Sequence, residues 1–129
     1  MNFYSLLTVG LGGFLGSVAR YATARMIDQR LNSFFPYGTL TVNILGSFIL
    51  GLIMGTSFKS IPDQSNWRLF LTTGFCGGFT TFSTFAFENV SLSEQRLFSA
   101  SVAYIVLSIV FGLLAVVAGI AFGKFLSQD

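Results

Sequence analysis

The sequence contains no histidine, a single cysteine (Cys76) and few charges, since only 9% of its 129 residues are Asp, Glu, Lys or Arg. A soluble domain of this size would contain about 25% charged residues. The missing histidine and the lone cysteine exclude an internal disulfide framework, a Cys/His zinc site and a Ser–His or Cys–His nucleophile pair. The seven Lys and Arg residues are scattered singly, so they form no basic patch for nucleic acid. We therefore expect neither an enzyme nor a nucleic-acid-binding protein.

Hydrophobic residues make up 53% of the chain and dominate four stretches without any charge. These stretches are Asn2–Ala19, Leu31–Phe58, Leu69–Phe87 and Leu97–Gly123, with 18, 28, 19 and 27 residues. A helix of about 20 mostly apolar residues crosses the roughly 30 Å hydrocarbon core of a bilayer. The sequence therefore predicts an all-α membrane protein. Its single domain, residues 1–129, would have four transmembrane helices at approximately 3–25, 37–58, 67–91 and 96–125.

The basic residues give little indication of how this domain inserts into the membrane. The side of the predicted termini carries three cations: Lys59, Arg68 and Lys124. The opposite side also carries three, with Arg20 lying deeper: Arg25, Arg30 and Arg96. A Lys/Arg excess normally orients a membrane protein, so a near balance is compatible with insertion in both orientations. Two oppositely inserted copies would form an antiparallel, dual-topology homodimer, although a single orientation set by other features remains an alternative.

Polar side chains within the predicted spans are candidates for function, because they are costly to place in hydrocarbon. Thr39 and Asn43 are four residues apart and share a helix face. The Asn43 amide can donate to an anion or to a neighbouring helix. Tyr104 and Ser108 share a face of the fourth span in the same way. Arg20, at the end of the first span, either reaches the interface or attracts anions into a vestibule.

The third span has the least helical composition of the four. Residues Gly74–Phe85 read GFCGGFTTFSTF, with three glycines in five residues followed by hydroxyl and aromatic side chains. Such a segment makes a poor continuous helix, which predicts either a helix broken at mid-membrane or a kink used for packing. A break would free backbone carbonyls, with Gly77 and Thr80 in position to offer them to a cation.

The aromatic and hydroxyl side chains of this span can be read in two ways. Phe82 and Phe85 share a face, and the positive edges of their rings can either contact a small anion or simply pack. The hydroxyls of this span either form a polar track with Tyr104 and Ser108 or bond to their own helix. These hydroxyls belong to Thr81, Ser83 and Thr84.

The Gly74–Phe85 segment closely resembles the signature of the Fluc family of bacterial fluoride channels, as do Gly38–Asn43 and the position of Arg20. The resemblance extends over essentially the whole chain in length, span number and span order. It implies four-helix subunits that assemble as antiparallel homodimers in the lipid of the bacterial inner membrane. Each dimer would contain two fluoride pores at the subunit interface.

The same resemblance assigns roles to individual residues. It implies that the carbonyl groups of Gly77 and Thr80 from both subunits hold one structural sodium ion on the two-fold axis. Asn43, Phe82 and Phe85 match pore residues, and Glu88 matches a family position near the end of the third helix. Two residues of the fourth helix resemble members of the family's polar track: Tyr104 and Ser108.

The implied function is passive, selective export of fluoride. The sequence has no Gly-x-x-x-x-Gly-Lys run for binding ATP. The main alternative, a small dual-topology multidrug or cation exporter, needs a carboxylate buried in its first helix, and residues 2–19 contain none. A second alternative, a non-transporting assembly subunit, explains the small residues at four-residue spacing, which allow close approach between helices. These include Gly12 and Gly16, Gly51 and Gly55, and Gly119 and Gly123. This alternative does not explain Asn43 together with a broken, hydroxyl-rich third helix.

Overall fold

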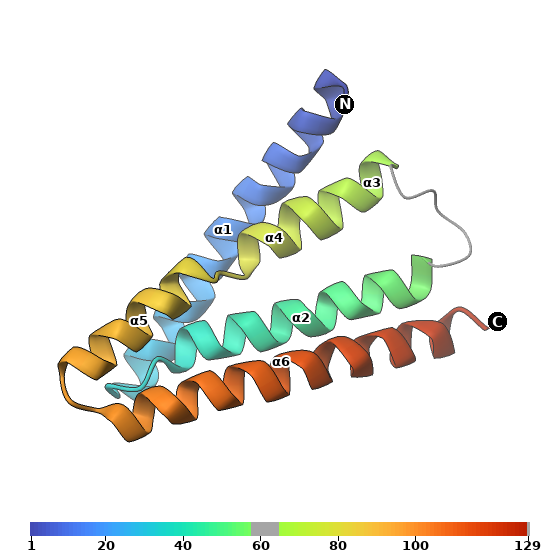
Figure 1. Ribbon diagram of the computed structural model, residues 1–129. Helices are drawn as coiled ribbons and strands as arrows, with labels where there is room; N and C mark the ends of the chain where they lie inside the picture. The colour runs from blue at the N-terminus through green and yellow to red at the C-terminus, as the bar shows by residue number, and fades with distance from the viewer. Residues whose placement is uncertain (58–64, 129) are drawn as a thin grey trace.

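The computed structural model describes residues 1–57 and 65–128, and every regular element within these ranges is helical (Figure 1). Three helices are long: α1 (Phe3–Leu31), α2 (Tyr37–Ser57) and α6 (Phe98–Leu126). The third helical region consists of four pieces: α3 (Asn66–Leu69), the π-helical η1 (Phe70–Cys76), α4 (Gly77–Phe79) and α5 (Ser83–Glu94). The predicted end of the second span at residue 58 and the cation Lys59 lie outside the described residues.

Local sequence signals explain where α1 and α2 begin and end. The Asn2 side chain accepts a 2.8 Å hydrogen bond from the N–H of Ser5 and caps the start of α1. Asn32, with φ 45° and ψ 50°, ends that helix in the left-handed conformation that asparagine tolerates. Pro36 directly precedes α2, where its fixed φ suits a helix start. The helix α1 therefore continues to Leu31, beyond residue 25 where the first span is predicted to end. The reason is that charged residues end an apolar segment but are compatible with an α-helix.

Glycines bring α1 into backbone contact with the third helical region. A Cβ atom at Gly12 would overlap the carbonyl oxygen of Phe70, and one at Gly16 would overlap that of Phe75. A Cβ at Gly78 would press on the backbone of α1 at Gly13 in the same way. Small residues allow helices to approach this closely, so α1 supports η1 and α4 along their length.

A second glycine interface joins α2 to α6. Gly51 and Gly55 of α2 face Gly119 and Gly123 of α6, and a Cβ at any of the four would overlap backbone atoms of the opposite helix. The close approach that the four-residue spacing predicts is therefore confirmed for these glycines. Gly112 of α6 differs, because nothing lies within 4 Å of the place its Cβ would occupy.

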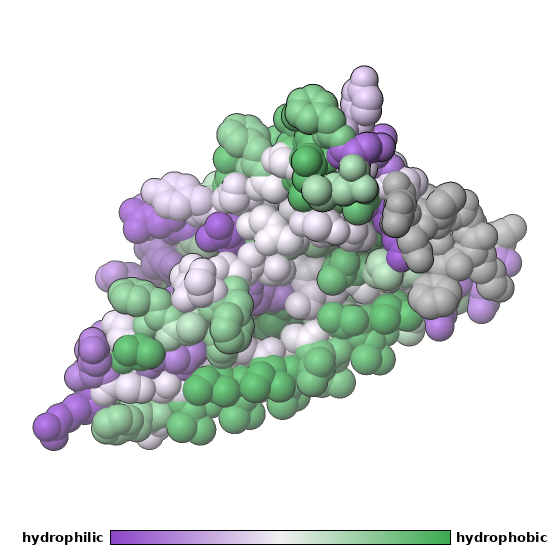
Figure 2. Space-filling model, turned by 45° about the horizontal axis from the view of Figure 1, so that its top comes forward, coloured by the Kyte–Doolittle hydropathy of each residue, from purple (hydrophilic) through white to green (hydrophobic). Residues whose placement is uncertain are grey.

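The surface of the chain is unusually apolar. Within the described residues, α2 and α6 are long and apolar enough to cross a membrane, and only 11% of the most apolar stretch of α6 is buried. The central helix of a soluble protein would be mostly buried instead. Figure 2 shows a hydrophobic band along the lower side of the molecule, with hydrophilic residues toward its two ends. An outward-facing apolar helix of this length indicates a helical membrane protein.

The helices begin and end at two opposite ends of the molecule (Figure 1). The start of α1, the end of α2, the start of α3 and the end of α6 lie toward one end, and the α5–α6 turn lies at the other. Arg68 and Lys124 therefore belong to the first end, and Arg96 to the second.

Candidate functional site

The third helical region is interrupted between α4 and α5. Thr80 has an extended backbone, with φ −91° and ψ 158°, and α5 begins only at Ser83. Just before the interruption, the backbone N–H of Gly77 reaches the carbonyl of Thr72, five residues back, as expected for the wide turns of a π-helix. Glycines and β-branched threonines disfavour a regular helix at this point, and other parts of the chain bind several of the freed backbone groups.

Two long-range side chains hold the backbone at the interruption. The Nε of Arg20 donates a 2.9 Å hydrogen bond to the carbonyl of Gly78. The Asn43 carboxamide pairs with both polar backbone groups of Thr81: its Oδ1 accepts from the Thr81 N–H at 2.8 Å, and its Nδ2 donates to the Thr81 carbonyl at 3.0 Å. The Thr81 hydroxyl in turn accepts from the N–H of Thr84 at 3.3 Å, at the start of α5.

A cavity of about 410 Å³ opens beside the interruption and draws its lining from α2, η1, α4, α5 and α6. Seven residues selected from the sequence line it: Asn43, Gly77, Thr80, Thr81, Phe82, Phe85 and Ser108. Six further lining residues were not selected: Gly46, Ser47, Leu50, Thr72, Cys76 and Ile109. Gly46 is essential to the shape, because a Cβ there would overlap the side chain of Thr80. None of the thirteen lining residues carries a charge.

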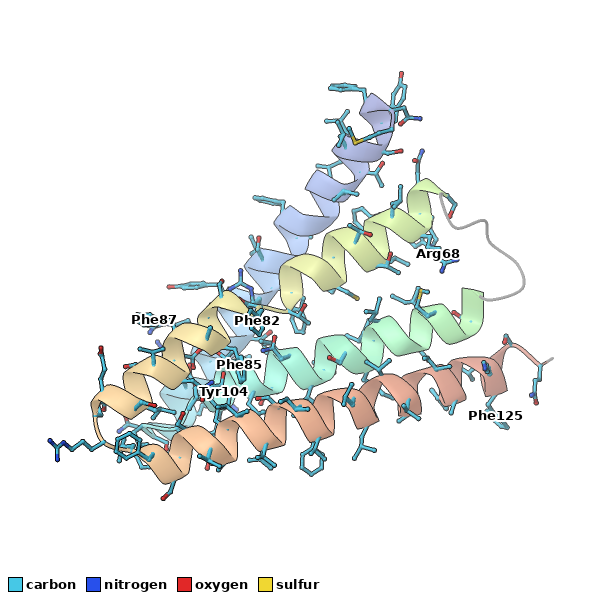
Figure 3. The ribbon with its side chains drawn as sticks, viewed as in Figure 1. Arg68, Phe82, Phe85, Phe87, Tyr104 and Phe125 are labelled. Atoms are coloured by element: carbon cyan, nitrogen blue, oxygen red, sulfur yellow. The ribbon has the colours of Figure 1, made fainter. Side chains whose placement is uncertain are left out.

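Three aromatic rings connect the cavity to α6. The ring centroids of Phe82 and Phe85 are 5.9 Å apart, and Phe85 meets Tyr104 edge to face at 5.0 Å. Figure 3 shows Phe85 and Tyr104 together between α5 and α6, whereas Phe87 points away from them. Tyr104 is fully buried. Among the described residues, neither its hydroxyl nor that of Ser108 has a hydrogen-bond partner.

A second cavity, of about 320 Å³, lies between α1, α2 and α5 and contains the charged groups of this region. Arg20, Thr81 and Thr84 line it, together with Arg25, Asp28 and Glu88. The Thr39 hydroxyl donates a 2.6 Å hydrogen bond to the Glu88 carboxyl group. This bond joins α2 to α5 through a neutral donor. Ser83 is exposed and lines neither of these two cavities, with its hydroxyl 3.5 Å from that of Thr81.

The structure adds contacts that sequence reasoning missed. Asp28 accepts a 2.9 Å hydrogen bond from the N–H of Gly38 and so caps the start of α2 from α1. Buried Asn89 accepts a 3.0 Å hydrogen bond from Ser101 and thereby joins α5 to α6. The signal that selected Asn43, an amide within an apolar span, applies equally to Asn89. No comparable signal marks Asp28, because its partner is a backbone group.

The donor atoms at the interruption suit a hard, singly charged cation. Among the described residues no hydrogen bond reaches the carbonyl oxygens of Gly77 and Thr80. Freed carbonyls at a helix break are ligands for ions such as sodium. The same residues contain no group of three or more His, Cys, Asp or Glu side chains that could hold a metal ion. A site here would therefore use neutral oxygen ligands.

Comparison with known proteins identifies the family. The family model described as CrcB-like protein, Camphor Resistance (CrcB), matches residues 7–120. The chain belongs to the CrcB family. A relative from Ruminiclostridium cellulolyticum is 45% identical over 115 residues, covering 89% of this chain and 88% of its own. A second, from Agrobacterium fabrum, is 42% identical over 120 residues, covering 93% of this chain and 96% of its own.

Both relatives bear the name fluoride-specific ion channel FluC. The resemblance of Gly74–Phe85 to the Fluc signature is therefore confirmed at the level of the family. CrcB relatives named in this way are channels rather than enzymes, which agrees with the missing nucleophile pairs and zinc ligands of this sequence.

Proposed function

We propose that this CrcB chain is the subunit of a passive, fluoride-selective ion channel that exports fluoride across the bacterial inner membrane. The observation that carries the proposal is the uncharged cavity at the interruption, where ring edges, hydroxyl groups and an amide converge. The family and the names of its FluC relatives support fluoride as the ion.

The lining chemistry suits an ion that must both enter and leave. A fixed positive charge would trap fluoride, whereas conduction needs several weak contacts. Phe82 and Phe85 would offer the positive edges of their rings. The Asn43 amide has two hydrogens, and only one is needed for the Thr81 carbonyl, so the other could be donated to fluoride. The Ser108 hydroxyl, which lines the cavity, would replace part of the hydration shell, and the family resemblance adds the hydroxyl of Tyr104.

The proposed assembly is an antiparallel homodimer in which each subunit crosses the membrane four times. Phe82 lines the cavity while 78% of its surface is exposed in the single chain, so the cavity wall is incomplete without a partner. The near balance of basic residues between the two ends supports insertion in both directions. In this arrangement the interruption lies at mid-membrane, and two pores run along the subunit interface.

A structural sodium ion completes the proposal. The carbonyl groups of Gly77 and Thr80 from both subunits would hold it at the two-fold axis and so fasten the two interruptions together. Such an ion would supply positive charge at the centre of the dimer, in a region whose cavity lining is uncharged.

Export follows from electrostatics without an energy source in the protein. Hydrogen fluoride crosses lipid uncharged and dissociates in the more neutral cytoplasm. An inside-negative potential drives the resulting anion outward by about 2.3 kcal/mol per 100 mV. A selective anion pore therefore suffices for export. Arg20, which lines the second cavity, would attract anions toward the entrance of the pore.

Efflux from liposomes tests the proposed function. Purified protein in liposomes loaded with potassium fluoride, with a potassium ionophore to balance charge, should release fluoride at a rate far above that of protein-free liposomes. Potassium chloride liposomes should retain their anion, because the pore is proposed to be selective. Equal release of both anions would remove the selectivity, and no release of either would remove the channel.

A further inference from the structure

Two backbone N–H groups at the interruption bond to side chains in place of the carbonyl groups that a continuous helix would supply. In a continuous α-helix each N–H bonds to the carbonyl four residues back. The N–H of Thr81 would then bond to the carbonyl of Gly77, and the N–H of Thr84 to that of Thr80. The structure shows neither bond within the described residues, and it pairs both N–H groups elsewhere.

Asn43 takes the first of these N–H groups. Its Oδ1 accepts from Thr81 at 2.8 Å, and its Nδ2 donates to the carbonyl of the same residue at 3.0 Å. In a helix the N–H and C=O of one residue point in opposite directions along the axis, so one carboxamide could not reach both. This pairing therefore stabilises the interrupted backbone selectively and leaves the Gly77 carbonyl without a donor.

The Thr81 side chain takes the second N–H group. Its hydroxyl oxygen accepts from the N–H of Thr84 at 3.3 Å and so acts as a cap for the start of α5. The Thr80 carbonyl, which a continuous helix would pair with that N–H, is left free. Arg20 meanwhile binds the intervening carbonyl of Gly78 at 2.9 Å, so that carbonyl has a protein partner.

We infer that Asn43 and Thr81 are positioning residues for the cation site, because they capture the two N–H groups that would otherwise occupy the carbonyl oxygens of Gly77 and Thr80. The inference rests on the proposed sodium site and deepens it. Asn43 thereby links two parts of the channel, since one amide hydrogen can serve the anion while its oxygen keeps a cation ligand available.

Sodium-dependent stability tests the inference without relying on flux. The purified protein in detergent is heated at a series of sodium concentrations, with N-methyl-glucamine as the replacement cation, and the midpoint of unfolding is followed. Bound sodium raises this midpoint by mass action. Asn43→Leu and Thr81→Val keep the size of each side chain but remove its hydrogen bond to the backbone N–H. Each should raise the half-saturating sodium concentration by roughly tenfold or more, because one hydrogen bond contributes about this much to a binding equilibrium.

Two matched variants serve as controls. Thr81→Ser keeps the hydroxyl and should bind sodium as the wild type does, which a role in packing alone would not predict. Thr8→Val removes a hydroxyl that donates to the Tyr4 carbonyl of its own helix, at 2.7 Å. Thr8 lines neither of the two cavities, so this variant should leave the sodium midpoint unchanged. Should Asn43→Leu fail to fold, the Thr81→Val and Thr81→Ser pair decides the question.

The outcomes separate this inference from the proposed function. Wild-type sodium dependence that persists unchanged in Thr81→Val and Asn43→Leu would overturn the positioning role and leave the channel intact. A wild type that conducts fluoride but shows no sodium-dependent stability would overturn both the sodium site and the inference. Weakened sodium binding in the two variants, with normal binding in Thr81→Ser and Thr8→Val, would support it.

Discussion

At the scale of single residues, several polar side chains of the membrane-spanning helices form hydrogen bonds to specific groups on other helices. Thr39 bonds to Glu88, Asn43 to the Thr81 backbone and Asn89 to Ser101. Tyr104 and Ser108 are exceptions, since neither buried hydroxyl makes a hydrogen bond of good geometry among the described residues. A buried hydroxyl without a full hydrogen bond is destabilising, and the family resemblance assigns the Tyr104 hydroxyl to the proposed polar track along α6.

Tyr104→Phe should therefore separate function from stability. We expect fluoride efflux from liposomes to fall several-fold, because the pore loses a hydrogen-bond donor. The midpoint of thermal unfolding should stay the same or rise, because an unsatisfied polar group has been removed. Tyr4→Phe, at a side chain that is 70% exposed near the start of α1, is the control and should leave both quantities unchanged. Wild-type efflux in Tyr104→Phe would contradict a role for this hydroxyl in the pore.

At the scale of elements, glycine faces determine how the helices approach one another. Such contacts bring backbone to backbone, and the close-packed interior leaves no room for an added methyl group. The α1 contacts hold η1 and α4 in place on one side of the interruption, and α2 carries both Asn43 and the glycines that contact α6. The site therefore depends on two interfaces that themselves contain few polar groups.

Two alanine substitutions in α6 test this dependence on the same helix. Gly119→Ala places a methyl group against the Phe48 carbonyl and 2.8 Å from the Leu52 nitrogen. It should lower the free energy of unfolding in detergent by about 1–3 kcal/mol. Gly112→Ala meets nothing within 4 Å and should raise that free energy by roughly 0.5–1 kcal/mol, because alanine is the better helix former. Equal effects of the two substitutions would show that close packing of α2 on α6 is not required.

At the scale of the whole molecule, the charge distribution leaves orientation undecided. The sequence has three cations on each predicted side of the membrane, so neither side has the excess of positive charge that retains a segment in the cytoplasm. The described structure agrees in placing Arg68 and Lys124 toward one end and Arg96 at the other. Together with the exposed Phe82 beside an uncharged cavity, this near balance supports the proposed assembly of two oppositely inserted copies.

Thiol labelling tests the dual topology directly. Gln128→Cys in a Cys76→Ala background places one exposed thiol near the end of α6. In sealed cells, a membrane-impermeant reagent should label about half of the copies, because the charge balance favours neither orientation. The remainder should react only after permeabilisation. Labelling of all copies from one side would contradict the antiparallel assembly.

Much of the local structure could be read from the sequence. Pro36 marks the predicted start of the second span through a backbone preference that acts within a few residues. Asn2 and Asn32 are local signals of the same kind, but the span limits are set by hydrophobicity and do not use them. The glycine rows and the unfavourable helix composition of Gly74–Phe85 are equally local. Seven of the selected residues line one cavity, among them Asn43 and Ser108. Tyr104, which the spacing grouped with Ser108, is buried and contacts Phe85 instead of lining that cavity.

The partners of the polar groups could not be read in this way. Periodicity tells which face of a helix a residue occupies, but not which atom of another helix comes opposite it. Arg20 with Gly78, Asn43 with Thr81 and Thr39 with Glu88 are separated by 58, 38 and 49 residues. Their pairing depends on where α1 and α2 meet the interrupted region.

The amino-acid sequence alone thus determined a helical membrane protein of the CrcB family with a weak point in its third helical region, because hydrophobicity and backbone propensity are properties of short segments. Only the tertiary structure decided that Asn43 binds the N–H of Thr81, and hence that this N–H is not available to the carbonyl oxygen of Gly77. Hydrogen bonds act over about 3 Å, and the glycine contacts that bring those atoms within this range exist only once the helices have packed.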